Sequence, residues 1–344
     1  MDTGDAGSRD MAANAEILSD PQVVLRRDRG IERLTELYAG NRPPTPMFLS
    51  GVTFPVHATR ESKPDDWVAS ALAAAARHAN AASDDAVFRP LAVEFGSRGV
   101  HFVDALLGAR TFRRHGQWWA QRLTTPVGAL APPDLDADEM WHDAREVAQA
   151  FVERGAEGAL FGSPTLSSAL NVAVNLYGER FLETLPTDPD AAFRDLATIN
   201  TLLRDLHRWY REHVPHEQLQ GVVAAHRCQP PGFGQLCGCS TQLLSAEMYR
   251  DFVAQPDADL LGDYPGGGMI HLCGGHTQHI PVWRDMSALR AVQLNDDAAD
   301  DFEEYYRGLR DDQMLYLNPT ATMTAARAIS ITGGRRLVVV ADAA

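Results

Sequence analysis

Apolar segments of strand length start at regular intervals in the last third of this 344-residue chain. They begin at Met269, Ala291, Met314 and Arg336, so that successive starts are 22, 23 and 22 residues apart. A strand, a turn and one crossover helix take up about this many residues. The spacing therefore predicts repeated β–α units with parallel strands, which restricts the fold to a barrel or a doubly wound open sheet.

Four earlier apolar segments bring the candidate strands to eight. These earlier segments are 47–53, 91–95, 158–161 and 219–225. Helical periodicity occupies longer stretches between the strands, among them 67–82, 138–155, 189–213, 245–253 and 298–309. Asp188, followed by Pro189, and Ser245 are expected to cap two of these helices. Eight strand–helix pairs predict an α/β fold of the (β/α)8 TIM-barrel type, with a doubly wound open sheet as the alternative.

The two ends of the chain and its charge limit the class of protein. Residues 1–28 are expected to be a flexible N-terminal lead, and residues 29–344 a single (β/α)8 barrel catalytic domain. The first 20 residues lack a basic start followed by an apolar block, so a cytoplasmic protein is expected. No apolar run of about 18 residues occurs, which predicts no membrane span. The net charge of −15 argues against nucleic acid or an anionic membrane surface as a partner.

The strand that starts at Met269 ends in His271-Leu-Cys273-Gly-Gly-His276. Residues i and i+2 of a strand face the same way, so His271 and Cys273 are expected to project together at the strand exit. Imidazole and thiolate are zinc-type ligands. Sites in both candidate folds lie at the carboxyl ends of strands, which favours a metal site here over a packed thiol beside a core histidine.

A third ligand is sought among the other cysteines and the acidic residues. Cys237-Gly-Cys239 ends a Pro/Gly-rich stretch, 229–238, that is expected to be a long loop after the preceding strand. The barrel topology would bring Cys239 beside His271, although a metal-free pair of packed cysteines is equally compatible with the pattern. Asp296, after the next strand, and Asp342 are alternative oxygen ligands.

Other polar residues at strand exits are candidate substrate contacts. Glu94 and Arg98 lie at and beyond the end of the second strand, and Asn318 ends another. A surface ion pair is the alternative role for Glu94 and Arg98, and a turn residue for Asn318. His276 is expected to contact substrate or support the ligands, and His279 to lie on the surface.

Three segments carry a resemblance to a known superfamily. They are Leu236-Cys-Gly-Cys-Ser-Thr-Gln-Leu-Leu-Ser-Ala-Glu-Met-Tyr-Arg-Asp-Phe252, Met269-Ile-His-Leu-Cys-Gly-Gly275 and Ala291-Val-Gln-Leu-Asn-Asp296. Together with Tyr177-Gly-Glu-Arg-Phe-Leu182 they resemble the uroporphyrinogen decarboxylase-like superfamily over roughly residue 90 onward. The resemblance implies a (β/α)8 barrel.

Within that superfamily the chain is more similar to the zinc-dependent corrinoid:thiol methyltransferases. Their His-x-Cys zinc ligands match His271 and Cys273, whereas the arginine-rich N-terminal signature of the decarboxylases is missing from Pro46-Met-Phe-Leu-Ser-Gly-Val-Thr-Phe-Pro55. The methyltransferases take another cysteine from the loop after the last strand. This chain ends Leu337-Val-Val-Val-Ala-Asp-Ala-Ala344, without it, so Cys239 or an aspartate would have to replace that ligand.

The resemblance and the residues together predict zinc-dependent methyl transfer to a small-molecule thiol. The donor would be a corrinoid on a separate protein or a small methyl compound. His271, Cys273 and Cys239 would hold Zn²⁺, and Asp296 would act as a catalytic orienting group or fourth ligand. A metal-free decarboxylase of a carboxylated substrate and a non-catalytic barrel that binds a corrinoid or tetrapyrrole are the alternatives.

Overall fold

The computed structural model describes residues 13–41, 45–56, 63–79, 87–221 and 226–341. The parallel strands are β1 (Met47–Leu49), β2 (Val52–Val56), β3 (Val87–Phe88), β4 (Leu91–Phe95), β7 (Leu160–Gly162), β8 (Leu219–Gln220), β9 (Gly234–Cys237), β10 (Gly268–Leu272), β11 (Leu289–Leu294), β12 (Met314–Leu317) and β13 (Leu337–Val340). An antiparallel hairpin comprises β5 (Thr111–Arg114) and β6 (Gln117–Ala120).

The helices alternate with these strands along the chain. They are α2 (Pro21–Tyr38), α3 (Pro64–Ala79), α4 (Phe102–Leu106), α5 (Glu139–Arg154), α6 (Ala169–Tyr177), α7 (Glu179–Thr187), α8 (Pro189–His213), α9 (Ala246–Phe252), α10 (Ala254–Gly262), α11 (Ile280–Asp285), α12 (Asp297–Asp300), α13 (Phe302–Gly308) and α14 (Ala325–Thr332), with 3₁₀ turns η1 (Gly99–His101), η2 (Cys239–Leu243) and η3 (Thr277–His279). The expected caps are confirmed, because the side chains of Asp188 and Ser245 accept from the backbone N–H groups of Ala191 and Met248.

The parallel strands form two sheets. In the described residues the larger sheet has the order β3-β1-β13-β12-β11-β10-β9 and the smaller one β2-β4-β7-β8. The sheets run into each other, since Phe48 of β1 lies opposite Val87 of β3 and Val52 of β2 lies opposite Leu91 of β4 in one continuous register. The predicted repetition of parallel β–α units is confirmed. A closed barrel is not shown, because no ladder among the described residues joins β8 to β9.

The strand β9 corrects the expectation of a long loop over 229–238. Its four residues, Gly234–Cys237, pair with β10 and are all buried, and Cys237 lies opposite His271. The sequence Gly-Gln-Leu-Cys has neither β-branched residues nor alternating hydrophobicity. Its extended conformation is set by the ladder with β10 and by burial between neighbouring elements, because its own residues have little intrinsic preference for a strand.

The helix α2 crosses the expected end of the flexible lead at residue 28. Residues 13–18 are already helical, and α2 starts at Pro21, with the side chain of Asp20 accepting from Gln22 N at 2.7 Å. Leu18 and Val23 are buried in the core. The expected boundary is therefore wrong for the described part of the lead, because a few widely spaced apolar residues anchor a segment that is polar overall.

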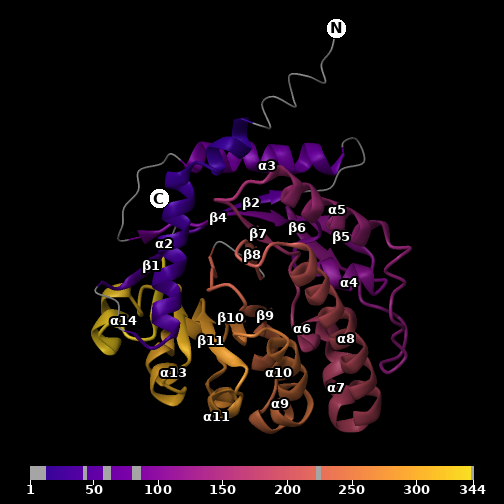
Figure 1. Ribbon diagram of the computed structural model, residues 1–344. Coiled ribbons are helices and arrows are strands. Elements are labelled where there is room, and N and C mark those ends of the chain that lie inside the picture. Colours follow the sequence, from indigo (N-terminus) through magenta and orange to yellow (C-terminus); the bar gives the residue numbers. More distant parts are fainter. Residues whose placement is uncertain (1–12, 42–44, 57–62, 80–86, 222–225, 342–344) are drawn as a thin grey trace.

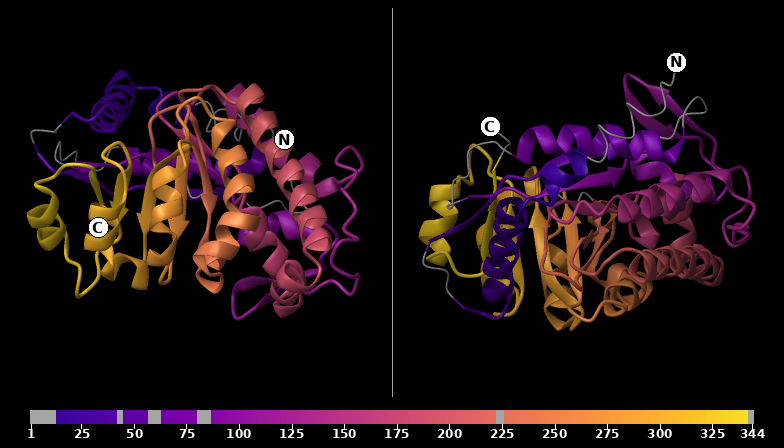
Figure 2. Two further views of the ribbon diagram at one scale, coloured as in Figure 1. Left: turned by 90° about the horizontal axis from the view of Figure 1, so that it is seen from below. Right: turned by 45° about the horizontal axis from the view of Figure 1, so that its top comes forward.

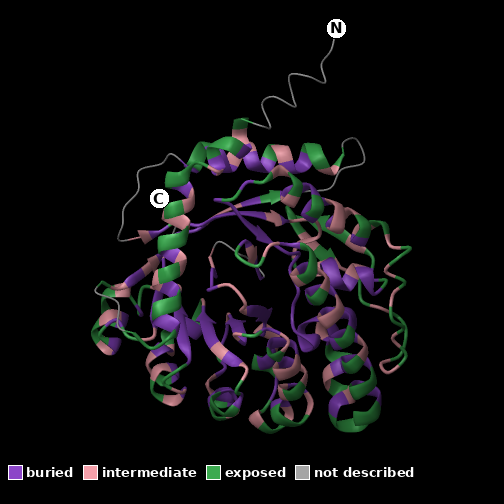
Figure 3. Cartoon of the chain, in the orientation of Figure 1, coloured by how far each residue is buried: buried purple, intermediate pink, exposed green. Residues whose placement is uncertain are grey.

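The helices lie on the outer side of the strands, as Figures 1 and 2 show. Their buried faces turn toward the sheets and their exposed faces toward solvent (Figure 3). This arrangement is expected for amphipathic helices that cover parallel strands. No helix among the described residues is long and apolar enough to cross a bilayer.

The opposite, inner face of the strands has its own apolar cluster. It is built from alternate strand residues, among them Met47, Leu49, Phe88, Ala92, Leu160, Met269, Ala291, Met314, Tyr316, Val338 and Val340, and Tyr38 of α2 joins it. The hydroxyl of Tyr38 lies 3.3 Å from that of Tyr316, which in turn donates to Cys228 O at 2.8 Å. Side chains two residues beyond this cluster on each strand emerge on the same face at the carboxyl ends, where the candidate site lies.

Candidate metal centre

Three predicted ligands come together at the ends of β9 and β10. Sγ of Cys273 lies 2.9 Å from Nε2 of His271 and 3.2 Å from Sγ of Cys239. All three ligand atoms lie within 4.8 Å of one another. His271 is buried and the two cysteines are half-buried. The structure thus forms a Cys/His/Cys group that could hold a metal ion.

The register of the strands explains why the group assembles. Cys237 pairs with His271, and Met269, which belongs to the inner cluster, precedes His271 by two residues on the same face. The N–H of Gly238 donates to His271 O at 2.8 Å and extends the ladder by one residue, and a Cβ on Gly238 would lie 2.7 Å from Cγ2 of Ile270, so a glycine is needed for this close approach. The 3₁₀ turn η2 begins at the next residue, Cys239, whose sulfur lies against that of Cys273.

The imidazole of His271 is held by the amide of Gln293, which Asn318 holds in turn. Nδ1 hydrogen-bonds to Oε1 of Gln293, whose Nε2 donates to Oδ1 of Asn318 at 2.6 Å. Because Gln293 accepts at its oxygen, the proton of the neutral ring lies on Nδ1 and the lone pair of Nε2 faces the sulfurs. Burial lowers the pKa of His271, which favours this neutral form. Asn318 therefore supports a ligand in this structure.

The two sulfurs titrate as a pair. The Cys239 thiol donates to Cys273, which lowers the pKa of Cys273 and raises that of Cys239. Two thiolates 3.2 Å apart would repel each other unless a cation lay between them. The pair consequently holds one proton that a metal ion would displace.

His276 and His279 fasten the two loops of the site to each other. Nε2 of His276 accepts from Gly274 N at 3.3 Å, so Nδ1 carries the proton and donates to Oγ1 of Thr241 at 2.9 Å. Burial lowers the pKa of His276 to about 4, and the side chain is 0% exposed. Both nitrogens are occupied, so His276 supports the ligand loop from behind. The expectation that His279 lies on the surface is wrong, since it is buried and its Nε2 bonds to Thr241 O at 2.8 Å.

Glu94 and Arg98 separate in the structure. Glu94 follows Ala92 of the inner cluster by two residues, so its side chain shares the face of His271. Arg98 adopts a left-handed backbone with φ of 69° and stacks over the ring of Trp118 at 4.6 Å. No ion pair joins Glu94 to Arg98 in the described part of the chain, where Arg98 instead fastens the β5–β6 hairpin to the exit of β4.

Asp296 stays outside the Cys/His/Cys group. It is exposed, has a φ of 48°, and accepts from Nδ2 of its neighbour Asn295 at 2.8 Å. Asp342, the other candidate oxygen ligand, lies outside the described residues. Of the candidates for the third ligand, Cys239 is the one whose donor atom the structure places beside His271 and Cys273.

Sequence reasoning did not single out Gln293 or Arg227. Gln293 interrupts the apolar run of β11, and a buried amide inside a strand was the available signal. Arg227 is 8% exposed, and its Nη1 lies 3.6 Å from Sγ of Cys237. Its segment, Arg227-Cys-Gln229, carries no periodic pattern that would predict its burial.

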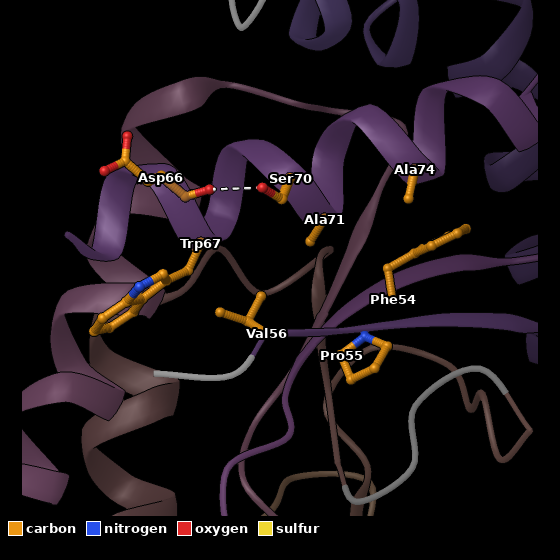
Figure 4. A pocket seen from close by; sticks show the side chains of 8 residues that line it. All are labelled: Phe54, Pro55, Val56, Asp66, Trp67, Ser70, Ala71 and Ala74. Atoms are coloured by element: carbon orange, nitrogen blue, oxygen red, sulfur yellow. Dashed lines mark hydrogen bonds between the residues drawn. The ribbon is translucent and has the colours of Figure 1, made fainter. Parts of the chain in front are cut away.

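A separate groove lies between β2 and α3 (Figure 4). Phe54, Val56 and Trp67 line it, and its polar side chains are Ser70 and Asp66. Ser70 Oγ donates to Asp66 O at 3.0 Å, within the helix itself. The groove offers apolar contact but no cluster of reactive groups, so it is not the candidate catalytic site.

The donor set fits a zinc-type ion. Structural and catalytic zinc sites are built from cysteine sulfur and histidine nitrogen, and a site with three protein ligands keeps a fourth position for substrate. The Nδ1–H of His271 is taken by an amide oxygen, as is usual for a metal-bound histidine. Cys239 and Cys273 are half-buried, whereas Cys228 and Cys237 are buried.

Comparison with known proteins supports the fold. No family model matches the chain, and no curated protein matches its sequence. Solved structures do match, among them a methyltransferase from Methanosarcina mazei, with a TM-score of 0.59 and 12% identity over 90% of this chain and 91% of that one. The similarity extends over nearly the whole length of both chains, so this protein has a methyltransferase-like α/β fold.

Proposed function

We propose that the protein catalyses zinc-dependent transfer of a methyl group to the sulfur of a thiol substrate. The observation that carries the proposal is the convergence of Cys239, His271 and Cys273 at the carboxyl ends of parallel strands. The methyltransferase-like fold supports it at the level of architecture. The methyl donor would be a corrinoid on a separate protein or a small methyl compound.

The proposal includes a closed (β/α)8 barrel of the uroporphyrinogen decarboxylase-like kind. Hydrogen bonds of Gln229, which lies in the segment between β8 and β9, to both strands support it. The side chain of Gln220 on β8 donates to Gln229 O at 3.1 Å and accepts from Gln229 N at 3.0 Å, and Nε2 of Gln229 donates to Gly234 O of β9 at 2.9 Å. The inner apolar cluster, to which strands of both sheets contribute, is also what a filled barrel requires.

Some residues of the site would bind the metal ion, and another orients a ligand. Cys239, Cys273 and Nε2 of His271 would hold Zn²⁺, and Gln293 keeps the imidazole in the tautomer that can bind it. When bound, the ion supplies a positive charge that lowers the pKa of a substrate thiol. The sulfur then attacks the methyl carbon, a C–S bond forms, the bond from methyl to donor breaks with its electron pair going to the donor, and the thiol proton passes to solvent.

The test combines metal analysis with a methyl-transfer assay. We expect about one zinc per chain in the purified protein, with transfer from free methylcobalamin to 2-mercaptoethanol lost on chelation and regained on adding zinc. His271→Ala should lose both the metal and the transfer, whereas Cys228→Ala, which removes a core thiol, should keep both. Absence of stoichiometric zinc, or zinc retained unchanged by His271→Ala, would refute the proposal.

A further inference from the structure

The carboxylate of Glu94 lies on the inner face of β4. Its Oε2 is buried and has no hydrogen-bond partner among the described residues. Burial raises the pKa of Glu94 to about 7, and the charge of Arg227 opposes the rise. A buried carboxylate that lacks donors costs free energy. The fold thus keeps at this position an acceptor that is suited to a donor from outside the chain.

The guanidinium of Arg227 is the matching group of opposite charge. The side chain is more than nine-tenths buried, and its Nε has no hydrogen-bond partner within the described part of the chain. Its backbone is fixed, because Nε2 of the buried Gln235 donates to Arg227 O at 2.7 Å. Nη1 of Arg227 donates to Sγ of Cys237 at 3.6 Å, so the protein fixes the guanidinium while leaving Nε for an acceptor from outside the chain.

Arg227 lies beside the Cys/His/Cys group, since its Nη1 is 3.6 Å from Sγ of Cys237, the residue that pairs with His271. Glu94 lies near the carboxyl end of β4, two residues beyond Ala92 of the inner cluster, and so shares the inner face with His271. Arg227 also partly offsets the rise in the pKa of Glu94 that burial causes, so its charge reaches the carboxylate. Yet no ion pair within 4.0 Å joins Arg227 to Glu94 in the described residues, which leaves the two charges apart.

We propose that Glu94 and Arg227 form a subsite for the polar end of the thiol substrate, and that this end carries both an ammonium and a carboxylate, as in an amino-acid thiol. The inference rests on the proposed function, since it places the substrate sulfur at Cys239, His271 and Cys273. Glu94 accepts from the ammonium, and Arg227 donates to the carboxylate. A substrate with one charge alone would leave the other buried group uncompensated, which gives the subsite its selectivity.

Four thiols test the subsite on protein loaded with Co²⁺, whose thiolate absorption band reports binding. L-Homocysteine carries both the ammonium and the carboxylate. 3-Mercaptopropionate carries only the carboxylate, 2-aminoethanethiol only the ammonium, and 2-mercaptoethanol neither charge. Charged hydrogen bonds contribute about 1.5–3 kcal/mol, so L-homocysteine should bind about tenfold or more tightly than either singly charged thiol. Equal affinities within about threefold would overturn the inference, and this comparison needs no variant.

Two substitutions assign the charges. Glu94→Gln should abolish the gain in affinity that an ammonium on the thiol gives and keep the gain from a carboxylate. Arg227→Gln should abolish the gain from the carboxylate and keep the gain from the ammonium. Glu247→Gln and Arg250→Gln, on the exposed side of α9, are matched controls that should leave all four affinities unchanged. A uniform loss across the four thiols in both variants would contradict separate recognition of the two charges.

The S-methyl derivatives of the same four thiols separate this inference from the proposed function. Their binding to metal-free protein, measured by calorimetry, depends on the polar end and needs no thiol–metal bond. The doubly charged thioether should again bind most tightly. If the protein takes up no metal but still binds the doubly charged thioether most tightly, only the proposed function is contradicted. If the doubly charged thioether has no advantage, the subsite is refuted whatever the metal content.

Discussion

Two groups of potential metal ligands in this protein differ in how their side chains are held. Cys239, His271 and Cys273 lie at the ends of β9 and β10, and His142, Asp143 and Glu146 lie on α5. In each group the ligand atoms are within 4.8 Å of one another. In the first, His271 is buried and fixed by Gln293. In the second, His142 is exposed and contacts Glu146 across one helical turn at 3.4 Å.

The difference shows that closeness of ligand atoms is a weaker indicator of a site than the way the ligands are fixed. Exposed side chains on a helix pay conformational entropy when they converge on an ion, and water already solvates them. The strand-end group has its tautomer set by Gln293 and its loops joined through Thr241 and His276. Only this group is organised before a ligand arrives.

The largest effect should come from removing His271. Its imidazole is the buried nitrogen ligand, so His271→Ala should weaken Zn²⁺ binding by more than about 100-fold, beyond what loss of a supporting residue costs. His142→Ala, the matched change on α5, should leave affinity and stoichiometry unchanged. Competition with a chromogenic chelator measures both. A loss of metal in His142→Ala would make the comparison between the two groups untenable.

Removal of the support behind His271 should have the next largest effect. Gln293→Leu leaves all three ligands in place but takes away the acceptor at Nδ1, and such supporting partners contribute about 10–100-fold to metal affinity. Gln313→Leu would be a poor control because Gln313 bonds to the backbone of the core. Gln255→Leu is preferable, since Gln255 is exposed on α10. Unchanged affinity in Gln293→Leu would show that orientation of the imidazole is unimportant here.

The pH dependence of metal binding should report the proton that Cys239 and Cys273 share. The pKa of Cys239 is raised by its hydrogen bond to Cys273, whereas His271 and Cys273, with lowered pKa values, are ready to bind at neutral pH. Metal binding then displaces one proton, so affinity should rise about tenfold per pH unit near pH 7 and fall correspondingly as pH decreases.

Cys239→Ala should weaken Zn²⁺ binding but keep the dependence, because Cys273 loses the hydrogen bond that lowers its pKa and then releases the proton itself. Cys228→Ala, outside the group, should preserve both the affinity and the dependence. Calorimetry of Zn²⁺ binding in buffers of different ionisation enthalpy counts the released protons. Release of no proton by the wild-type protein near pH 7 would show that the two sulfurs do not share one.

The smallest effect is expected on α5. A partly exposed pair spaced i, i+4 stabilises a helix by about 0.3–0.5 kcal/mol, so Glu146→Gln should change the free energy of unfolding by no more than that. Urea unfolding with and without zinc measures it. If zinc raised the free energy of unfolding of the wild type by more than about 1 kcal/mol and did not do so in Glu146→Gln, α5 would hold a second metal site. The two groups would then not differ as described above.

The part of the site that could be predicted from sequence depends on fixed local geometry. His271 and Cys273 face one way because strand side chains alternate, and their strand was recognised from an apolar run with regular spacing. Cys239 required topology as well, because it lies 32 residues before His271 in the chain. The sequence marks Gln293 only as an amide within an apolar run and gives no signal for Arg227, since the importance of both comes from what they contact across strands and loops.

By itself, the sequence determined the β–α repeat, the helix caps at Asp188 and Ser245, and the paired orientation of His271 and Cys273, all of which follow from periodicity and bonding over a few residues. The tertiary structure alone decided that β9 is a strand, that α2 anchors part of the N-terminal lead, and that His279 is buried while Asp296 is exposed. Burial and ladder pairing result from packing between segments far apart in the chain, and no local pattern records which segment will cover which.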